Sequence, residues 1–160
     1  MKTSTKIIFY PFFMIMMLVF TSCEPGTVYK KIKKLPENRM LRDTSFTFEF
    51  NNTNQAETYD IVLLFRYVHG FQFKQVVFDL EYFSVNKNPI RFTFGIPIVG
   101  NDGKYIGEGM GDIWDIEHTI LSKQRLPEGI NTFVIQNKTH LDLNYIPNVM
   151  EVGLKIVQAK

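Results

Sequence analysis

The sequence predicts an all-β fold, an antiparallel β-sandwich of the immunoglobulin-like or jelly-roll-like type with about seven or eight strands. Phenylalanine occurs 15 times, whereas alanine occurs only at Ala56 and Ala159. This bias disfavours a helix bundle and favours pleated sheets packed through aromatic side chains. From Ser45 onward, apolar and polar residues alternate, and turn residues separate the alternating segments. A chain of 160 residues is expected to form a single folded domain, which we assign to residues 44–160.

The first 22 residues have the pattern of an export signal. Lys2 and Lys6 precede an uncharged segment of 14 residues, Ile7 to Phe20. A membrane-spanning helix needs about 20 apolar residues, so this segment is too short to span and instead fits the hydrophobic region of a secretory signal. We therefore expect residues 1–22 to be removed from the mature protein.

The signal ends at the only cysteine of the chain. A single cysteine excludes a disulfide framework, a cysteine-rich zinc site and a CxxC redox pair. Phe20-Thr21-Ser22-Cys23 resembles the bacterial lipobox, which implies that the Cys23 thiol is acylated and that Cys23 becomes the new N-terminus. The alternative is an ordinary signal peptide with an incidental cysteine. We therefore expect a protein of the cell envelope, lipid-anchored to a membrane with its folded domain in the periplasm. The sequence leaves the choice between outer and inner membrane open, with the outer slightly favoured.

Residues 23–43 are predicted to form a basic, flexible tether. Between positions 23 and 42 the chain has six basic and two acidic residues, and its net charge is therefore +4. Such a run either lies on anionic headgroups or is simply solvated. As a flexible coil it would span roughly 25 Å and let the folded domain stand off the membrane.

The first predicted strands follow from period-two alternation. Phe46, Phe48 and Phe50 share one face of the first strand. The segment 59–67 is apolar on both faces and is expected to be central in its sheet. The segments 76–82 and 90–98 also alternate, and Pro97 predicts a sheet edge because proline cannot donate to a ladder.

The remaining strands are bounded by turns. Asn101-Asp102-Gly103 is a strong turn signal. The segment 119–125 is a weaker strand candidate and is followed by the turn at 126–129. The segments 131–136 and 152–156 complete the predicted sandwich.

The sequence contains no recognisable catalytic constellation. Of the serines that follow Cys23, none lies in a G-x-S-x-G elbow, and the three histidines are far apart without the spacing of a metalloprotease. Basic residues of the predicted domain are not interleaved with aromatic ones, which argues against nucleic-acid binding. We therefore predict a protein that is not an enzyme, with no catalytic residues, no cofactor and no established metal site, and leave the oligomeric state open.

The segment 107–117 is the only other candidate for chemistry. Its glycines do not match the dinucleotide-binding spacing and are expected to allow positive φ in a tight loop. Four carboxylates lie in or beside this loop: Glu108, Asp112, Asp115 and Glu117. They suggest a loop that binds Ca²⁺ or a glycan, and the alternative is a solvated acidic loop. An enzyme site would require several of these carboxylates and His118 to converge in one pocket, whereas Trp114 is expected to be a buried anchor.

Several motifs in order resemble those of the gliding-motility lipoprotein GldH family. The central one is the run from Asn101 to Ile113, NDGKYIGEGMGDI, and it is accompanied by Cys23, Leu35-Pro36, the segment 59–66, Leu126-Pro127-Glu128-Gly129 and the segment 152–156. This resemblance implies a non-enzymatic accessory of the gliding machinery, held to a membrane by lipid, with other envelope proteins of that machinery as partners. The main alternative is an envelope β-sandwich that binds a glycan or Ca²⁺ through 107–117.

Overall fold

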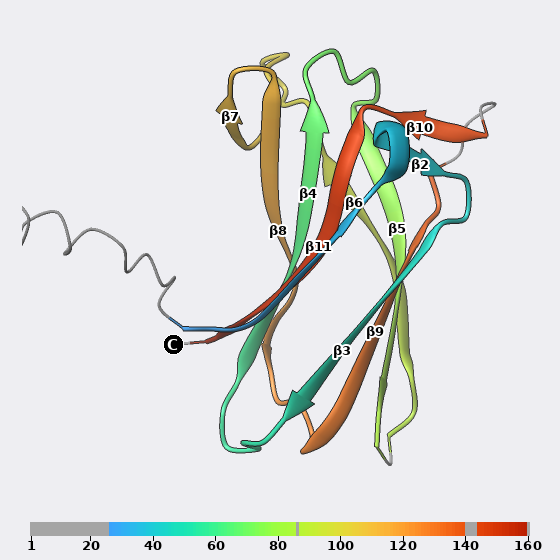
Figure 1. Cartoon of the computed structure of the whole chain (residues 1–160). Coiled ribbons are helices and arrows are strands. Elements are labelled where there is room, and N and C mark those ends of the chain that lie inside the picture. The colour runs from blue at the N-terminus through green and yellow to red at the C-terminus, as the bar shows by residue number, and fades with distance from the viewer. Residues whose placement is uncertain (1–25, 86, 140–143, 160) are drawn as a thin grey trace, which may run out of the picture.

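The computed structural model describes residues 26–85, 87–139 and 144–159. Two antiparallel sheets face each other and form a sandwich, and a two-stranded ribbon lies at one end (Figure 1). The all-β sandwich predicted from the sequence is thus confirmed, with eleven strands among the described residues instead of seven or eight.

The described strands form two larger sheets and one two-stranded ribbon. The five-stranded sheet contains, in order, β1 (Thr27–Lys34), β11 (Val149–Gln158), β4 (Tyr59–Val68), β8 (Ile113–Gln124) and β7 (Glu108–Met110). The four-stranded sheet contains β3 (Ser45–Asn52), β9 (Gly129–Asn137), β5 (Gln75–Ser84) and β6 (Ile90–Pro97). The ribbon pairs β10 (Tyr145–Pro147) with β2 (Arg39–Leu41), which follows a 3₁₀ turn, η1 (Pro36–Asn38).

The core lies between the two sheets and is built from the inward side of each alternating pattern. Phe48, Phe65, Phe78 and Phe133 are fully buried. The rings of Tyr82 and Phe133 stack with centroids 4.8 Å apart. Each fully buried aromatic or aliphatic side chain contributes about 1.5–3 kcal/mol, so this phenylalanine-rich interior is the main source of stability.

For β3, β4 and β6, the sequence pattern correctly predicts which side chains are buried or where the strand lies in its sheet. The β3 side chains Phe46 and Phe48 are buried and Phe50 is half-buried, as their shared face predicts. Strand β4 lies in the centre of its sheet, in agreement with its two apolar faces. Pro97 lies on β6, which is an edge strand, as its missing N–H donor requires.

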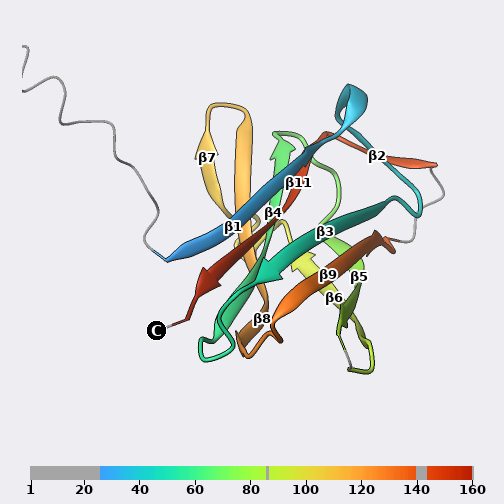
Figure 2. The same ribbon diagram turned by 60° about the horizontal axis from the view of Figure 1, so that its bottom comes forward.

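The structure differs from the predicted tether. Residues 27–34 form β1, which pairs antiparallel with β11 from Thr27 to Lys34 along the edge of the five-stranded sheet (Figure 2). The four lysines of this strand are exposed. Lysine side chains on an edge strand oppose pairing with a second chain, which gives the basic run a structural reason. The folded domain therefore begins at Thr27 rather than at residue 44.

The expectations for the export signal and for acylation at Cys23 concern residues outside the described part of the chain. Within the described ranges, no helix has the length and apolar character needed to cross a membrane.

Candidate functional site

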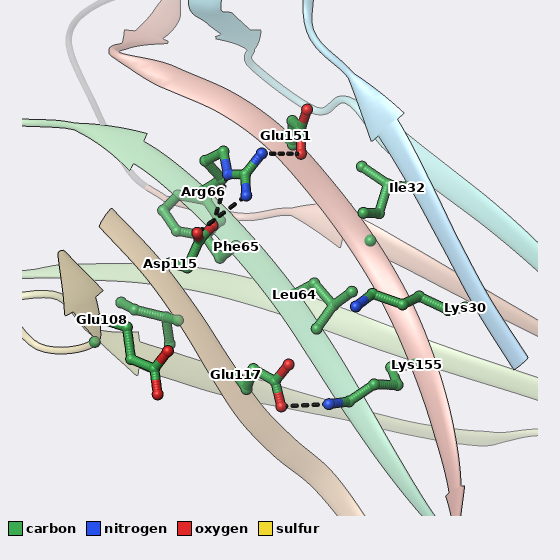
Figure 3. Close-up of a pocket in the computed structure, with 13 residues that line it drawn as sticks. Lys30, Ile32, Leu64, Phe65, Arg66, Glu108, Asp115, Glu117, Glu151 and Lys155 are labelled. Atoms are coloured by element: carbon green, nitrogen blue, oxygen red, sulfur yellow. Dashed lines mark hydrogen bonds and ion pairs between the residues drawn. The ribbon is translucent and has the colours of Figure 1, made fainter. Parts of the chain in front are cut away.

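The candidate site is a groove of about 610 Å³ on the outer face of the five-stranded sheet (Figure 3). All five strands of this sheet contribute to its lining or its rim. The residues that line it are Lys30, Ile32, Leu64, Phe65, Arg66, Gly107, Glu108, Asp115, Ile116, Glu117, Glu151, Gly153 and Lys155, of which Phe65 and Ile116 belong to the buried core. The groove is thus mainly polar, with a small apolar floor from Leu64 and Ile32.

One cross-strand row of the groove alternates in charge over most of its length. Its members, one from each strand, are Lys34, Glu151, Arg66, Asp115 and Glu108. Directly opposed side chains in a sheet are close enough to interact, so opposite charges in such a row favour this register.

Arg66 is the centre of this row. Its Nε and Nη2 donate to the two carboxylate oxygens of Asp115 at 2.6 and 3.0 Å, and its Nη1 donates to Glu151 at 3.1 Å. The hydrogen bonds to Asp115 raise the pKa of Arg66, while partial burial acts in the opposite direction. A guanidinium fits this planar, two-pronged contact, so the three side chains hold β11, β4 and β8 in register.

A second ion pair joins β8 and β11, two residues beyond Asp115 on β8 and four residues beyond Glu151 on β11. Lys155 Nζ lies 2.5 Å from Glu117 Oε2, and the lysine side chain is only 9% exposed. A buried ammonium is costly to desolvate, so it requires a carboxylate partner at this position. Glu117 itself is half-exposed and remains accessible from the groove.

Two glycines give the groove its depth. A Cβ on Gly153 would lie 2.8 Å from the Lys31 carbonyl oxygen and 3.1 Å from Ile32 Cγ1. Gly107 has φ +113°, and a Cβ there would collide with the carbonyl oxygen of Asp115. Both positions therefore need a residue without a side chain, since the neighbouring backbone cannot move aside.

The β7–β8 hairpin beside the groove is supported by an aromatic cluster. The Tyr67 hydroxyl donates to the Ile106 carbonyl at 3.0 Å, and burial raises the pKa of Tyr67 to about 12. The ring of Tyr105 lies 5.6 Å from that of Tyr67 and 5.4 Å from that of Trp114. A Cβ on Gly109 would approach three Trp114 ring atoms at 3.1 Å. Trp114 is partly buried against the core, in keeping with its predicted role as an anchor.

The structure corrects the expectation of an acidic loop at 107–117. Most of this segment is a hairpin of two strands, β7 and β8, because Glu108 to Met110 pair with Ile113 to Asp115. Glu108, Asp115 and Glu117 line the groove, whereas Asp112 lies in the turn, where its carbonyl accepts the His69 N–H at 2.6 Å. Three of the four predicted carboxylates are thus brought together on one face.

This arrangement does not resemble a cation site. Among the described residues, no group of three or more His, Cys, Asp or Glu side chains is placed to hold a metal ion. Asp115 and Glu117 are directed to Arg66 and Lys155, so their negative charge is already balanced by protein cations. His118 does not line the groove; its ring stacks 6.0 Å from that of Phe94, and burial lowers its pKa.

Sequence reasoning did not identify the basic side chains of the groove. Arg66 is one of two charged residues on the outward side of β4, and Glu151, Gly153 and Lys155 recur with period two in β11. Period two in two strands that pair directly is the signal that would have placed these residues on one face.

Comparison with protein families gives one match. A family model described as GldH lipoprotein matches residues 27–156. The match begins at the first residue of β1 and ends within β11, so it covers both sheets of the sandwich. No curated protein matches the chain.

Proposed function

Because the chain belongs to the GldH lipoprotein family, we propose that it is a membrane-anchored, non-enzymatic accessory of the bacterial gliding-motility machinery. The observation that carries this proposal is the family match over 27–156, which spans nearly all of the described sandwich.

A role without catalysis is supported by the chemistry of the groove. Arg66 forms ion pairs with both Asp115 and Glu151, and Lys155 forms one with Glu117. The carboxylates at the centre of the groove are thus engaged in hydrogen bonds with protein cations. The groove is instead suited to contact with another envelope protein, to which Glu108 and the half-exposed Glu117 offer acceptors.

The proposed anchor is Cys23, after removal of residues 1–22. Two or more acyl chains hold a protein stably on a bilayer, whereas one chain binds reversibly. The folded domain then lies in the periplasm, attached to the inner or the outer membrane, of which the outer is slightly favoured. The support for this assignment is the sequence at 20–23 together with the membership of a lipoprotein family.

Two measurements test the proposal. Deletion of the gene in a gliding strain should abolish spreading over a surface, and the wild-type gene should restore it; normal spreading of the deletion strain removes the motility assignment. The variant Cys23→Ala should lose metabolic labelling with fatty acid and leave the membrane fraction. A Cys23→Ala protein that remains membrane-bound shows that the anchor lies elsewhere.

A further inference from the structure

The folded domain starts very close to the proposed anchor. Strand β1 begins at Thr27, only four residues after Cys23. Four residues span at most about 14 Å even when fully extended. This is well below the roughly 25 Å expected for a flexible tether of residues 23–43. An acylated Cys23 therefore holds the first strand, and with it the whole sandwich, at the membrane surface.

The position of Thr27 defines which end of the sandwich is held there. The Tyr29 ring packs against the Phe50 ring at 5.8 Å, and Phe50 pairs with Asn131 near the start of β9. Thr27 pairs with Val157 at the end of β11, and the next residue of β11, Gln158, pairs with Tyr59 at the start of β4. The β3–β4 and β8–β9 connections, residues 53–58 and 125–128, adjoin this corner, and the β5–β6 connection lies at the same end of the sandwich but at its opposite side (Figures 1 and 2). We call this end of the sandwich the anchor end.

The anchor end exposes a group of apolar side chains on the outer face of the four-stranded sheet. Phe83, Val85 and Ile130 are 37%, 53% and 57% exposed. Phe83 pairs with Thr132, and a Cβ placed on Gly129 would lie 3.8 Å from Val85 Cγ2, so the ends of β5 and β9 bring the three together. We call these three residues the apolar tip. Neighbouring exposed apolar side chains are typical of a surface that is covered by something else.

The charges around the apolar tip are close to balanced. The three connections of the anchor end and the adjoining strand ends carry Lys87, Arg91, Lys123 and Arg125 against Glu57, Asp60 and Glu128. So small an excess of positive charge gives little attraction to anionic headgroups, and any contact with lipid must depend mainly on the apolar side chains.

The opposite end of the sandwich points away from the anchor. Strand β8 runs from Ile113 to Gln124, and Gln124 pairs with Tyr59 at the anchor end. At about 3.3 Å per residue, Ile113 and the adjoining hairpin turn lie about 35 Å from that end. Met110 lies on β7 of this hairpin and is 85% exposed (Figure 1). It therefore serves as an exposed apolar control position far from the anchor end.

We propose that the anchor end rests on the lipid surface, with Phe83, Val85 and Ile130 inserted among the headgroups and the β7–β8 hairpin directed away from the membrane. This orientation rests on the proposed acylation of Cys23. It combines two independent observations, the short distance from Cys23 to β1 and the exposed apolar side chains at the same end.

The orientation can be measured with the full-length acylated protein in phosphatidylcholine vesicles. Acylation consumes Cys23, the only cysteine, so Val85→Cys, Ile130→Cys and Met110→Cys each offer a single thiol for an environment-sensitive fluorophore. We expect labels at 85 and 130 to emit at shorter wavelength, to be quenched by nitroxide lipids, and to be protected several-fold from aqueous iodide relative to the label at 110.

The readouts separate the orientation from the anchor. Vesicle flotation reports the anchor: acylated protein that fails to float refutes attachment through Cys23. If the protein floats but its labels at 85 and 130 are as accessible to iodide as the label at 110, the proposed orientation is wrong. The apolar tip would then be a contact surface for another protein. Protection that is equal in phosphatidylcholine and phosphatidylglycerol vesicles supports apolar contact, whereas protection found only with the anionic lipid refutes insertion of the apolar tip.

Discussion

Arg66 on β4 and Asp115 on β8 form a bidentate ion pair, with Nε–Oδ1 and Nη2–Oδ2 distances of 2.6 and 3.0 Å. The two residues are direct cross-strand partners, 49 positions apart in the chain. The ion pair can therefore form only when β4 and β8 are in this register.

The variant Arg66→Lys should destabilise the domain by about 1 kcal/mol, because an ammonium cannot reproduce the planar two-pronged contact. Urea denaturation measures this as a lower midpoint. The control is Arg91→Lys, which changes an exposed pair with Glu81 on the other sheet and should cost less than about 0.5 kcal/mol. Equal losses of unfolding free energy in both variants would show that the bidentate geometry at Arg66 adds no stability beyond that of an exposed ion pair.

Replacing one or the other partner of the Lys155–Glu117 ion pair should have unequal effects on the stability of the domain. Glu117→Gln takes the carboxylate from Lys155, whose side chain is only 9% exposed, and should cost about 1–3 kcal/mol. Lys155→Met removes the buried charge and keeps the side-chain length, so it should be neutral to within about 1 kcal/mol. Calorimetric melting of both variants checks this. A larger loss for Lys155→Met than for Glu117→Gln contradicts the interpretation.

Gly107 should tolerate alanine far less than Gly103 does. Both residues have positive φ, but a Cβ on Gly107 collides with the Asp115 backbone, whereas nothing lies within 4 Å of a Cβ on Gly103. We expect Gly103→Ala to lower the free energy of unfolding by about 1 kcal/mol and Gly107→Ala to lower it by about 3 kcal/mol or more. Chemical denaturation compares the two, and similar losses would mean that the backbone contact at Gly107 relaxes easily.

Stability should fall at mildly acidic pH through His118. Burial lowers the pKa of this histidine in the folded state, so the folded protein binds its proton less readily than the unfolded chain does. Its contribution is fully present above the unfolded pKa of about 6.5 and is lost as pH falls from there through the folded pKa. Urea denaturation at pH 7.5 and pH 5 should show this loss, and His118→Gln should reduce it. An unchanged pH dependence in His118→Gln would assign the effect to other groups.

Removal of β1 should unfold or aggregate the domain. A chain that begins at Glu24 retains the pairing of β1 with β11. A chain that begins at Pro36 leaves β11 as an unpaired edge strand and removes the Tyr29 ring that packs on Phe50. Circular dichroism should give a cooperative melt for the first chain and a loss of it for the second. If residues 27–35 were only a tether, the two chains would melt alike.

The strand pattern in the sequence predicts the main sandwich because period-two alternation reports directly on burial. It is clearest in β3, β5 and β9, whose inward side chains all face the core. It fails for β1, because an edge strand with lysines on both faces has no apolar period. It also fails for β7, since three exposed residues are too few to show one.

The candidate site was predictable only in part. The glycines and carboxylates of 107–117 mark one rim of the groove, but its centre depends on Arg66 and Lys155, which are distant in sequence. Only the register of β11, β4 and β8 brings them together, and pairing between distant strands is not encoded in local spacing.

The pairing of β1 with β11 also determines how a mechanical load enters the domain. Strand β1 runs from Thr27 at the anchor end toward Lys34, so a pull transmitted from an acyl group on Cys23 acts along the strand. The hydrogen bonds of an antiparallel ladder are perpendicular to the strands, and such a pull therefore shears the seven β1–β11 residue pairs together. A ladder opened from one end would break its bonds one after another, at much lower force. If Cys23 is acylated and the protein serves the gliding machinery as proposed, β1 acts as a force-resistant link between lipid and sandwich.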